Sequence, residues 1–107
     1  MVLYGNIKMK IWVDDIRPAP EGWDWIRSVN YAKYAIEFYE SRNVEIEFLS
    51  LDHDAGDFAC DGGDYIKLLD WLEETGRNYP IRIHSANAVG VENMRRIIER
   101  NGWKEIK

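Results

Sequence analysis

The chain has 107 residues, with 19 Asp and Glu against 14 Lys and Arg, which gives a formal net charge of −5. This length fits a single domain spanning 1–107, and the acidic balance argues against nonspecific binding to duplex nucleic acid, which a basic face normally supports. The lone Cys60, a start without signal-peptide features and the lack of a run of ~20 apolar residues predict a cytoplasmic protein that does not enter membranes.

The first part of the chain contains two strand patterns joined by a loop. Lys8–Val13 is an apolar strand that runs directly into Asp14 and Asp15. Two prolines and a glycine in residues 17–22 exclude a helix there, so this stretch is predicted to be a loop. Residues 23–29 alternate in polarity and favour β-structure, which predicts a short strand at the edge of a sheet.

The middle of the chain predicts a helix, a strand and a long loop. Asn30 is the expected N-cap of the helix, whose apolar residues follow helical spacing: Ala32, Ala35, Ile36 and Tyr39. Glu45–Leu51 is the third strand, and it ends in Asp52, His53 and Asp54. The loop 52–63 is rich in Asp and Gly, and Asp61 is expected to cap the helix that follows.

The last part of the chain predicts two helices and two short strands. One helix has an apolar face at helical spacing, Tyr65, Leu68, Leu69 and Leu72, and Gly76 is its natural stop. Pro80 precedes a strand over Ile81–His84. A final helix over 89–101 ends at Gly102, and a fifth strand is expected over 103–106.

Strands that alternate with helices predict an α/β fold with one doubly wound, mostly parallel sheet and helices on both of its faces. The order 2-1-3-4-5 is the common one for five strands. The helix between the first two strands is missing, so the second strand is expected to be displaced, shortened or differently paired. In this order the first, third and fourth strands are neighbours, and the titratable residues at their ends meet at the switch point of the sheet.

Three features resemble the receiver fold of response regulators. An acidic pair follows the first strand, Asp52 closes the third, and Ser85-Ala86 follows the fourth, where receivers carry a hydroxyl residue and a small residue. The lysine that follows the fifth strand in receivers has only Lys104 and Lys107 as candidates, and neither precedes a proline. The final helix of receivers has no counterpart in this chain.

The chain is more similar to a divergent branch, the cyclic-phosphate processing receiver-like domain. The motifs that carry this resemblance are Asp14-Asp15-Ile16-Arg17-Pro18, Leu51-Asp52-His53-Asp54 and His84-Ser85-Ala86-Asn87. One departure is the loop 55–63, where Phe58, Ala59 and Cys60 interrupt the acidic run. The resemblance implies activity on cyclic phosphate esters.

Asp14, Asp15 and Asp52 lie at the ends of neighbouring strands, where their charges repel one another unless a cation or a proton is shared. A divalent ion with oxygen ligands, most simply Mg²⁺, meets this electrostatic need. The alternative is that one carboxylate caps a turn and the others face solvent. The aspartates of the glycine-rich loop, Asp57, Asp61 and Asp64, are expected to be turn formers and caps.

His53 and His84 are the two histidines of the chain, and both follow strands that are predicted to be neighbours. Histidine titrates near neutral pH, so a pair can act as general base and general acid in opening a cyclic phosphodiester. Asp52 and Asp54 flank His53 and can orient its ring. The alternative is that both histidines are hydrogen-bonded structural residues.

The remaining candidates are expected to contact phosphate. Arg17 can bind a phosphate group in bidentate fashion, and Asp54, Ser85 and Asn87 complete the predicted substrate site. Ser85 and Asn87 precede a helix N-terminus, which favours an anion, although Asn87 can instead simply start that helix. Gly90 would allow a ligand to approach the backbone closely. Four tryptophans are expected to pack, and one near the site can stack on a nucleobase: Trp12, Trp23, Trp25 and Trp71.

The sequence therefore supports three functions. The first is a small phosphoesterase that processes the cyclic phosphate of a nucleotide or RNA end by two-histidine chemistry, with a small phosphorylated ligand as its partner. The second is an atypical receiver that accepts phosphate on Asp52, with Mg²⁺ bound by Asp14 and Asp15. The third is a nucleotide-binding domain without catalysis. No surface pattern is clear enough to identify a protein partner.

Overall fold

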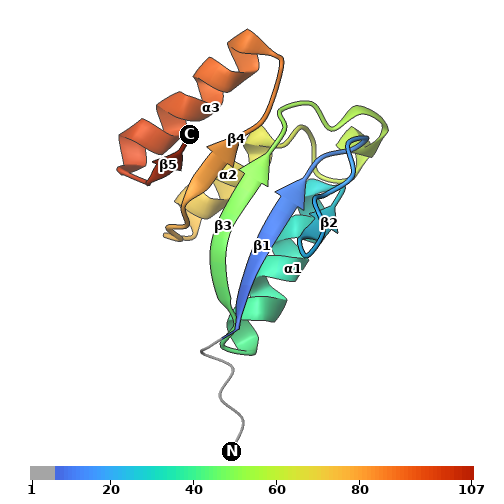
Figure 1. Cartoon of the computed structure of the whole chain (residues 1–107). Coiled ribbons are helices and arrows are strands. Elements are labelled where there is room, and N and C mark those ends of the chain that lie inside the picture. Colours follow the sequence, from blue (N-terminus) through green and yellow to red (C-terminus); the bar gives the residue numbers. More distant parts are fainter. Residues whose placement is uncertain (1–6) are drawn as a thin grey trace, which may run out of the picture.

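The structure is a computed structural model that describes residues 7–107; residues 1–6, and with them most of the stretch that lacks signal-peptide features, lie outside the description. Within 7–107 the chain forms five strands and three α-helices (Figure 1). In chain order they are β1 (Lys8–Val13), β2 (Asp24–Ile26), α1 (Val29–Ser41), β3 (Glu45–Leu51), α2 (Ile66–Glu74), β4 (Ile81–Ile83), α3 (Ala88–Asn101) and β5 (Glu105–Ile106). The predicted loop 52–63 also contains a 3-10 turn over Gly56–Cys60.

The sheet has the predicted order β2-β1-β3-β4-β5, and each of its four strand pairs is parallel. The predicted α/β fold class is therefore confirmed, including the missing helix between the first two strands. The structure also decides between the options for β2. It is shortened to Asp24–Ile26, but it is neither displaced nor differently paired, because Trp25 lies opposite Trp12 in a regular parallel register.

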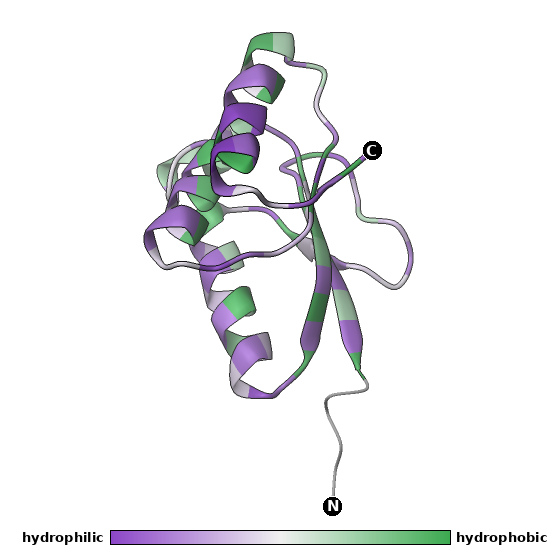
Figure 2. Cartoon of the chain, turned by 90° about the vertical axis from the view of Figure 1, so that its left-hand side faces the viewer, coloured by the Kyte–Doolittle hydropathy of each residue, from purple (hydrophilic) through white to green (hydrophobic). Residues whose placement is uncertain are grey.

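The three helices lie on one face of the sheet, whereas the sequence predicted helices on both faces (Figure 2). The reason is topological. The connections β2 to β3, β3 to β4 and β4 to β5 all advance across the sheet in the same direction, so right-handed crossovers place all three helices on the same side. Only the connection from β1 to β2 runs the other way, and residues 14–23 contain no helix.

The core lies between this helical layer and the sheet. Strand residues that alternate toward the helices are fully or almost fully buried: Ile11, Val13, Ile46, Leu49, Leu51 and Ile81. The buried faces of the helices meet them with Ala32, Ala35, Ile36, Leu68, Leu69, Leu72, Met94, Ile97 and Ile98. The opposite faces of the same strands carry partly or largely exposed residues apart from the fully buried Ser50, so the apolar core lies on one side of the sheet.

The start of α1 differs from the prediction. The N-cap is Ser28, whose Oγ accepts a hydrogen bond from the backbone N–H of Tyr31 at 3.1 Å, so Asn30 lies inside the first turn. Asp61 does not cap α2, which has no side-chain cap. Its carboxylate instead accepts hydrogen bonds from Ser28 Oγ at 2.6 Å and Asn30 Nδ2 at 3.0 Å, and so ties the long loop to the start of α1.

The ends of the helices follow the glycine pattern. Gly76 follows the C-cap of α2 with φ +69°, and Gly102 ends α3 in the left-handed conformation with φ +66°. Both conformations favour glycine because a side chain would be strained there. Asn87 caps the N-terminus of α3, since its Oδ1 accepts a hydrogen bond from the N–H of Gly90 at 2.9 Å.

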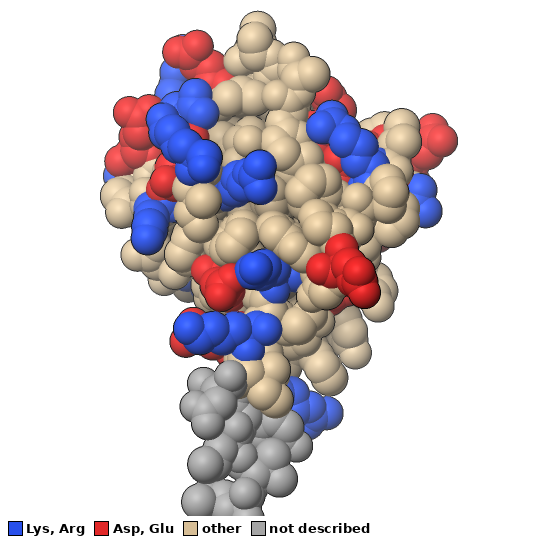
Figure 3. Space-filling model, in the orientation of Figure 1, with Lys and Arg blue, Asp and Glu red and all other residues tan. Residues whose placement is uncertain are grey.

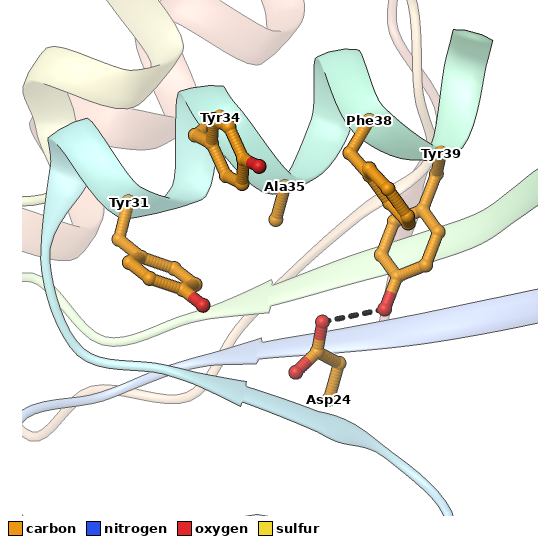
Figure 4. A pocket seen from close by; sticks show the side chains of 6 residues that line it. All are labelled: Asp24, Tyr31, Tyr34, Ala35, Phe38 and Tyr39. Atoms are coloured by element: carbon orange, nitrogen blue, oxygen red, sulfur yellow. Dashed lines mark hydrogen bonds between the residues drawn. The ribbon is translucent and has the colours of Figure 1, made fainter. Parts of the chain in front are cut away.

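A groove runs between α1 and the edge strand β2 (Figure 4). The aromatic side chains of Tyr31, Tyr34 and Phe38 line it and are substantially exposed. At one end the Tyr39 hydroxyl donates a hydrogen bond to the carboxylate of Asp24 at 2.6 Å, which joins α1 to β2 (Figure 4). None of the helices in 7–107 has both the length and the apolar character needed to cross a bilayer.

Candidate functional site

The carboxyl ends of β1, β3 and β4 lie side by side at one edge of the sheet (Figure 1). The backbone N–H of Asp52 donates to the carbonyl of Val13 at 2.9 Å, and that of His84 donates to Leu51 at 2.8 Å. These bonds continue the ladders one residue beyond each strand. Asp14, Asp52 and His84 are therefore brought to the same edge, as the strand order predicted.

The acidic cluster consists of Asp14, Asp15 and Asp52. One carboxylate oxygen from each lies within 4.8 Å of the others. Asp14 is fully buried and Asp52 is 8% exposed, so solvent does little to screen their charges. Burial, together with repulsion from the other two carboxylates, raises the pKa of Asp15 above its ordinary value.

Asp14 is the most strongly held member of the cluster. Its Oδ1 accepts hydrogen bonds from the backbone N–H groups of Ile16 and Arg17, both at 2.9 Å. Its Oδ2 lies 3.0 Å from His84 Nε2. Burial opposes the charged form, but these three hydrogen bonds outweigh it and lower the pKa of Asp14, which is therefore a carboxylate at neutral pH.

His84 is held on every side. Its Nδ1 lies 2.8 Å from Ser50 Oγ, its Nε2 contacts Asp14, and its ring stacks on Trp12 with centroids 3.8 Å apart and an interplanar angle of 8°. Burial lowers the pKa of His84 against the opposing attraction of Asp14, so the ring is neutral at pH 7. Because the Asp14 carboxylate can only accept, we assign the ring hydrogen to Nε2, and Nδ1 then accepts from the Ser50 hydroxyl.

His53 is arranged differently. Its Nδ1 lies 2.9 Å from Asp54 Oδ1 and 3.4 Å from Asn87 Nδ2, and no protein group in 7–107 hydrogen-bonds its Nε2. Its ring packs against the Cα of Gly90. The sequence predicted that Gly90 would let a ligand approach the backbone closely, but in the structure the His53 imidazole occupies that space. His53 can therefore use Nε2 in proton transfer, while the contact between Nδ1 and Asp54 fixes the orientation of the ring.

Asp54, Ser85 and Asn87 lie around His53 and the start of α3. The Asn87 amide donates to Asp54 Oδ2 at 3.3 Å while its oxygen caps α3. Ser85 Oγ accepts a hydrogen bond from the N–H of Asn87 at 3.1 Å. The hydrogen bond from His53, followed by that from Asn87, lowers the pKa of Asp54. The view that Asn87 starts the helix is confirmed, and phosphate contacts of Asp54, Ser85 and Asn87 stay predictions.

Arg17 lies at the mouth of the acidic cluster. Its Nε is 3.6 Å from Asp14 Oδ2 and its Nη2 is 3.9 Å from Asp52 Oδ2, while Nη1 donates to the carbonyl of His84 at 3.4 Å. The side chain is 53% exposed, so the guanidinium group keeps donors that face solvent. A cation in this position can contact both the cluster and an incoming anion.

The acidic cluster fits a divalent cation of the Mg²⁺ type. It offers three carboxylates on two strand ends, and hard cations prefer oxygen ligands. Burial and then the charges of Asp14 and Asp52 raise the pKa of Asp15, and a bound cation would offset both effects. A second group, His53, Asp54 and Asp64, also has ligand atoms within 4.8 Å of one another, but Asp64 Oδ1 already accepts the N–H of Ala55 at 2.9 Å.

The sequence analysis missed the roles of three residues that shape the site. Ser50 is the one polar residue inside the apolar run of β3, and this signal could have indicated its role as the partner of His84. Trp12 gave no such signal, because stacking on His84 depends on the neighbouring strands. A Cβ on Gly56 would collide with the Asp15 carboxylate, so this glycine lets the long loop close over the cluster.

Comparison with protein families matches residues 9–100 to the cyclic-phosphate processing receiver domain. The match covers most of the chain and contains each of the residues placed at the site. The comparisons with curated proteins and with solved structures found no match. The parallel sheet, its strand order and the family match agree, and the chain belongs to the cyclic-phosphate processing receiver domain family.

Proposed function

We propose that this protein is a small phosphoesterase that hydrolyses the cyclic phosphate of a nucleotide or RNA end. The observation that carries the proposal is that the His53–Asp54 pair directly follows Asp52 of the acidic cluster, whose Oδ1 accepts a hydrogen bond from the backbone N–H of His53 at 2.8 Å and whose Oδ2 lies 3.9 Å from Arg17 Nη2. An oriented imidazole, a cation-binding cluster and a guanidinium group are together suited to phosphate ester hydrolysis. The family match supports cyclic phosphate as the reacting group.

Asp14, Asp15 and Asp52 are the residues that would hold Mg²⁺. When bound there, the ion supplies positive charge that polarises a phosphoryl oxygen. Arg17 adds a second positive charge, and its exposed donors bind the nonbridging oxygens of the phosphate. Mg²⁺ and the Arg17 guanidinium together would then balance the negative charge of the three carboxylates.

His53 carries the proton transfer. In the reaction a bond forms between water oxygen and phosphorus, and the bond from phosphorus to one ring oxygen breaks. His53 Nε2 takes the proton of the attacking water, because Nδ1 is held by Asp54. The leaving oxygen takes a proton from solvent and His53 Nε2 gives its proton back to solvent, so one water is consumed and the cyclic ester opens to a phosphate monoester and a hydroxyl group.

His84 has a different role in this proposal from the one that the sequence predicted. It is neutral, and both ring nitrogens are hydrogen-bonded to the protein. We therefore assign it to positioning Asp14, which it holds through Nε2. The sequence-based alternative, in which His84 is the general acid, makes a different prediction for the pH profile of a His84 variant.

The test is phosphorus NMR with a panel of 2′,3′-cyclic and 3′,5′-cyclic nucleotides, with and without Mg²⁺. We expect ring opening that falls by roughly 100-fold or more in His53→Gln. In His84→Gln the rate also falls, but the shape of the pH–rate profile is the same as in the wild type. Loss of one limb of that profile in His84→Gln would instead make His84 the acid or base. An absence of ring opening across the panel would refute the proposal for these substrates.

A second candidate is an atypical receiver that accepts a phosphoryl group on Asp52. It is favoured by the position of Asp52 at the end of β3, inside the acidic cluster and in a member of a receiver family. Incubation with acetyl phosphate and Mg²⁺, followed by intact-protein mass spectrometry, tests this function. It predicts a phosphorylated species that is lost in Asp52→Asn and retained in His53→Gln.

A further inference from the structure

No helix of residues 7–107 covers one face of the sheet (Figures 1 and 2). Three neighbouring strands, β1, β3 and β4, contribute to this face. Lys10 lies opposite Phe48, and Trp12 lies opposite Ser50, in the register of β1 and β3. Arg82 of β4 lies opposite Ser50 on the other side. Paired residues of parallel strands project to the same side, so all five belong to this face, on which Ser50 alone of the five is fully buried.

Aromatic rings gather on this face. Trp23, from the connection before β2, stands edge-on to Trp12, with ring centroids 5.7 Å apart and an interplanar angle of 88°. It makes the same kind of contact with Phe48, at 5.1 Å and 88°. The Lys10 Nζ lies 5.6 Å from the Trp23 ring and 5.9 Å from the Phe48 ring. We call these four residues together with Arg82 the aromatic sheet face.

The aromatic sheet face is continuous with the candidate site. Trp12 stacks directly on His84, which in turn contacts Asp14 of the acidic cluster. The Trp12 Nε1 donates a hydrogen bond to the carbonyl of Arg17 at 2.9 Å. A ligand with its phosphate at Arg17 therefore has the rings of the sheet next to it.

The charged side chains on this side of the molecule are of both signs. The chain is acidic, with a net charge of −5, and both basic and acidic side chains stand on this side with neutral surface between them (Figure 3). Arg82 and Arg17 are exposed, whereas Lys10 is paired with Glu47 at 3.6 Å in a partly exposed contact. Aromatic rings next to basic groups are the combination that binds single-stranded nucleic acid, by stacking and by contacts to the phosphates.

We propose that the aromatic sheet face binds the bases of a single-stranded oligonucleotide whose cyclic phosphate terminus lies at the acidic cluster. This inference rests on the proposed function and extends it, because it makes an oligonucleotide end, rather than a free mononucleotide, the preferred substrate. Stacking is tolerant of base identity, so the preference is for length and single-strandedness and not for sequence.

The test is fluorescence anisotropy with a single-stranded RNA hexanucleotide that ends in a 3′-phosphate and so cannot react. Uridine 3′-monophosphate is the competitor. We expect the hexanucleotide to bind at least ~10-fold more tightly than the mononucleotide, since each stacked base contributes roughly 5- to 100-fold. Phe48→Leu, which keeps an apolar side chain but removes the ring, weakens hexanucleotide binding by about 5-fold or more.

Two further variants sharpen the result. Arg82→Gln lowers the slope of log affinity against log salt by about 0.7, the value for one phosphate contact on a single strand. Tyr34→Ala removes a ring that is 64% exposed on α1, on the helical side of the molecule, and leaves the affinity unchanged. Circular dichroism of each variant establishes that it is folded.

Equal affinity for the hexanucleotide and the mononucleotide would overturn the proposal, as would wild-type binding by Phe48→Leu. A dimer in sedimentation equilibrium that Phe48→Leu dissociates would also overturn it and assign the face to a second copy of the chain. Hexanucleotide binding that depends on Phe48, without ring opening of any cyclic phosphate, would refute the hydrolytic function and leave the binding surface established.

Discussion

His53 owes its position to a single glycine. The ring rests against Gly90 in α3, and a Cβ at this position would lie within 2.6 Å of His53 Cδ2. A side chain cannot be accommodated at that distance, so either the imidazole or the helix must move. The orientation that Asp54 and Asn87 give to the ring depends on this empty space.

Gly90→Ala is therefore expected to displace the His53 ring. The clash costs about 1–3 kcal/mol of unfolding free energy, and the ring resonances of His53 shift in ¹H–¹⁵N NMR spectra of the imidazoles. Gly102→Ala is the matched control, because nothing lies within 4 Å of its Cβ and only the positive φ is strained. The control loses stability without a change at His53. Unchanged His53 resonances in Gly90→Ala would show that the glycine does not position the ring.

The ends of the strands create the acidic cluster, which no single element contains. β1 contributes Asp14 and Asp15, and β3 contributes Asp52. Their proximity follows from the parallel pairing of these two strands, in which Val13 lies opposite Leu51. The repulsion between the carboxylates is thus a consequence of the sheet, and a bound cation or proton would reduce it further than Arg17 does.

Mg²⁺ is expected to stabilise the protein through this cluster. Binding to the folded state alone raises the unfolding free energy by roughly 2.7 kcal/mol at 100 times the dissociation constant, which scanning calorimetry detects as a higher melting temperature. Asp15→Asn removes one ligand and one repulsive charge, so the metal-free variant melts higher than the wild type and responds less to Mg²⁺.

Asp57→Asn is the control for this experiment, because Asp57 is exposed on the 3-10 turn and outside the cluster. It should respond to Mg²⁺ as the wild type does. If Asp15→Asn and Asp57→Asn respond alike, the ion is bound elsewhere.

At the start of α1, one serine serves two elements. Ser28 caps the helix and also donates to Asp61 of the long loop. Ser28→Ala is expected to cost about 1–2 kcal/mol of unfolding free energy, since a helix cap and a link to the loop are both lost. Urea unfolding measures this change. Ser41→Ala, at the other end of α1 with an exposed bond to the Phe38 carbonyl, should be nearly neutral. Equal effects of the two substitutions would contradict the capping role.

On the scale of the whole molecule, stability is expected to depend on pH through His84 and Asp14. Burial lowers the pKa of His84 below its ordinary value of 6.5, so the unfolded chain binds the proton more readily. The stabilisation is complete above pH 6.5 and is lost as the pH falls through the lower folded pKa. The lowered pKa of Asp14 extends the loss to more acidic pH, while the raised pKa of Asp15 acts in the opposite direction.

Urea unfolding between about pH 5 and about pH 7.5 measures this dependence, with a slope of at most about 1.4 kcal/mol per pH unit for one proton. In His84→Gln the slope in this range becomes shallower. Ser41→Ala, which is remote from the site, keeps the slope of the wild type. An unchanged slope in His84→Gln would assign the pH dependence to other groups.

Much of the fold could be predicted because the sequence encodes it locally. Short stretches indicate their own conformation, as in the apolar run of β3, the helical spacing of Leu68, Leu69 and Leu72, and the glycine that ends α3. The cap at Ser28 was missed because Ser28 and Asn30 are both good caps, and the choice between them depends on Asp61, which lies far along the chain.

For the candidate site, the sequence alone determined which residues lie at the strand ends. An apolar run that stops at an Asp or a His can be recognised in the sequence without any knowledge of the fold. Tertiary structure alone decided what each group can do. The rings of Trp12 and His84 are stacked only because β1 and β4 flank β3, and His53 is oriented only because Gly90 leaves room for it. The uncovered face of the sheet is likewise a property of the crossovers, since all three helices follow connections that turn to the same side.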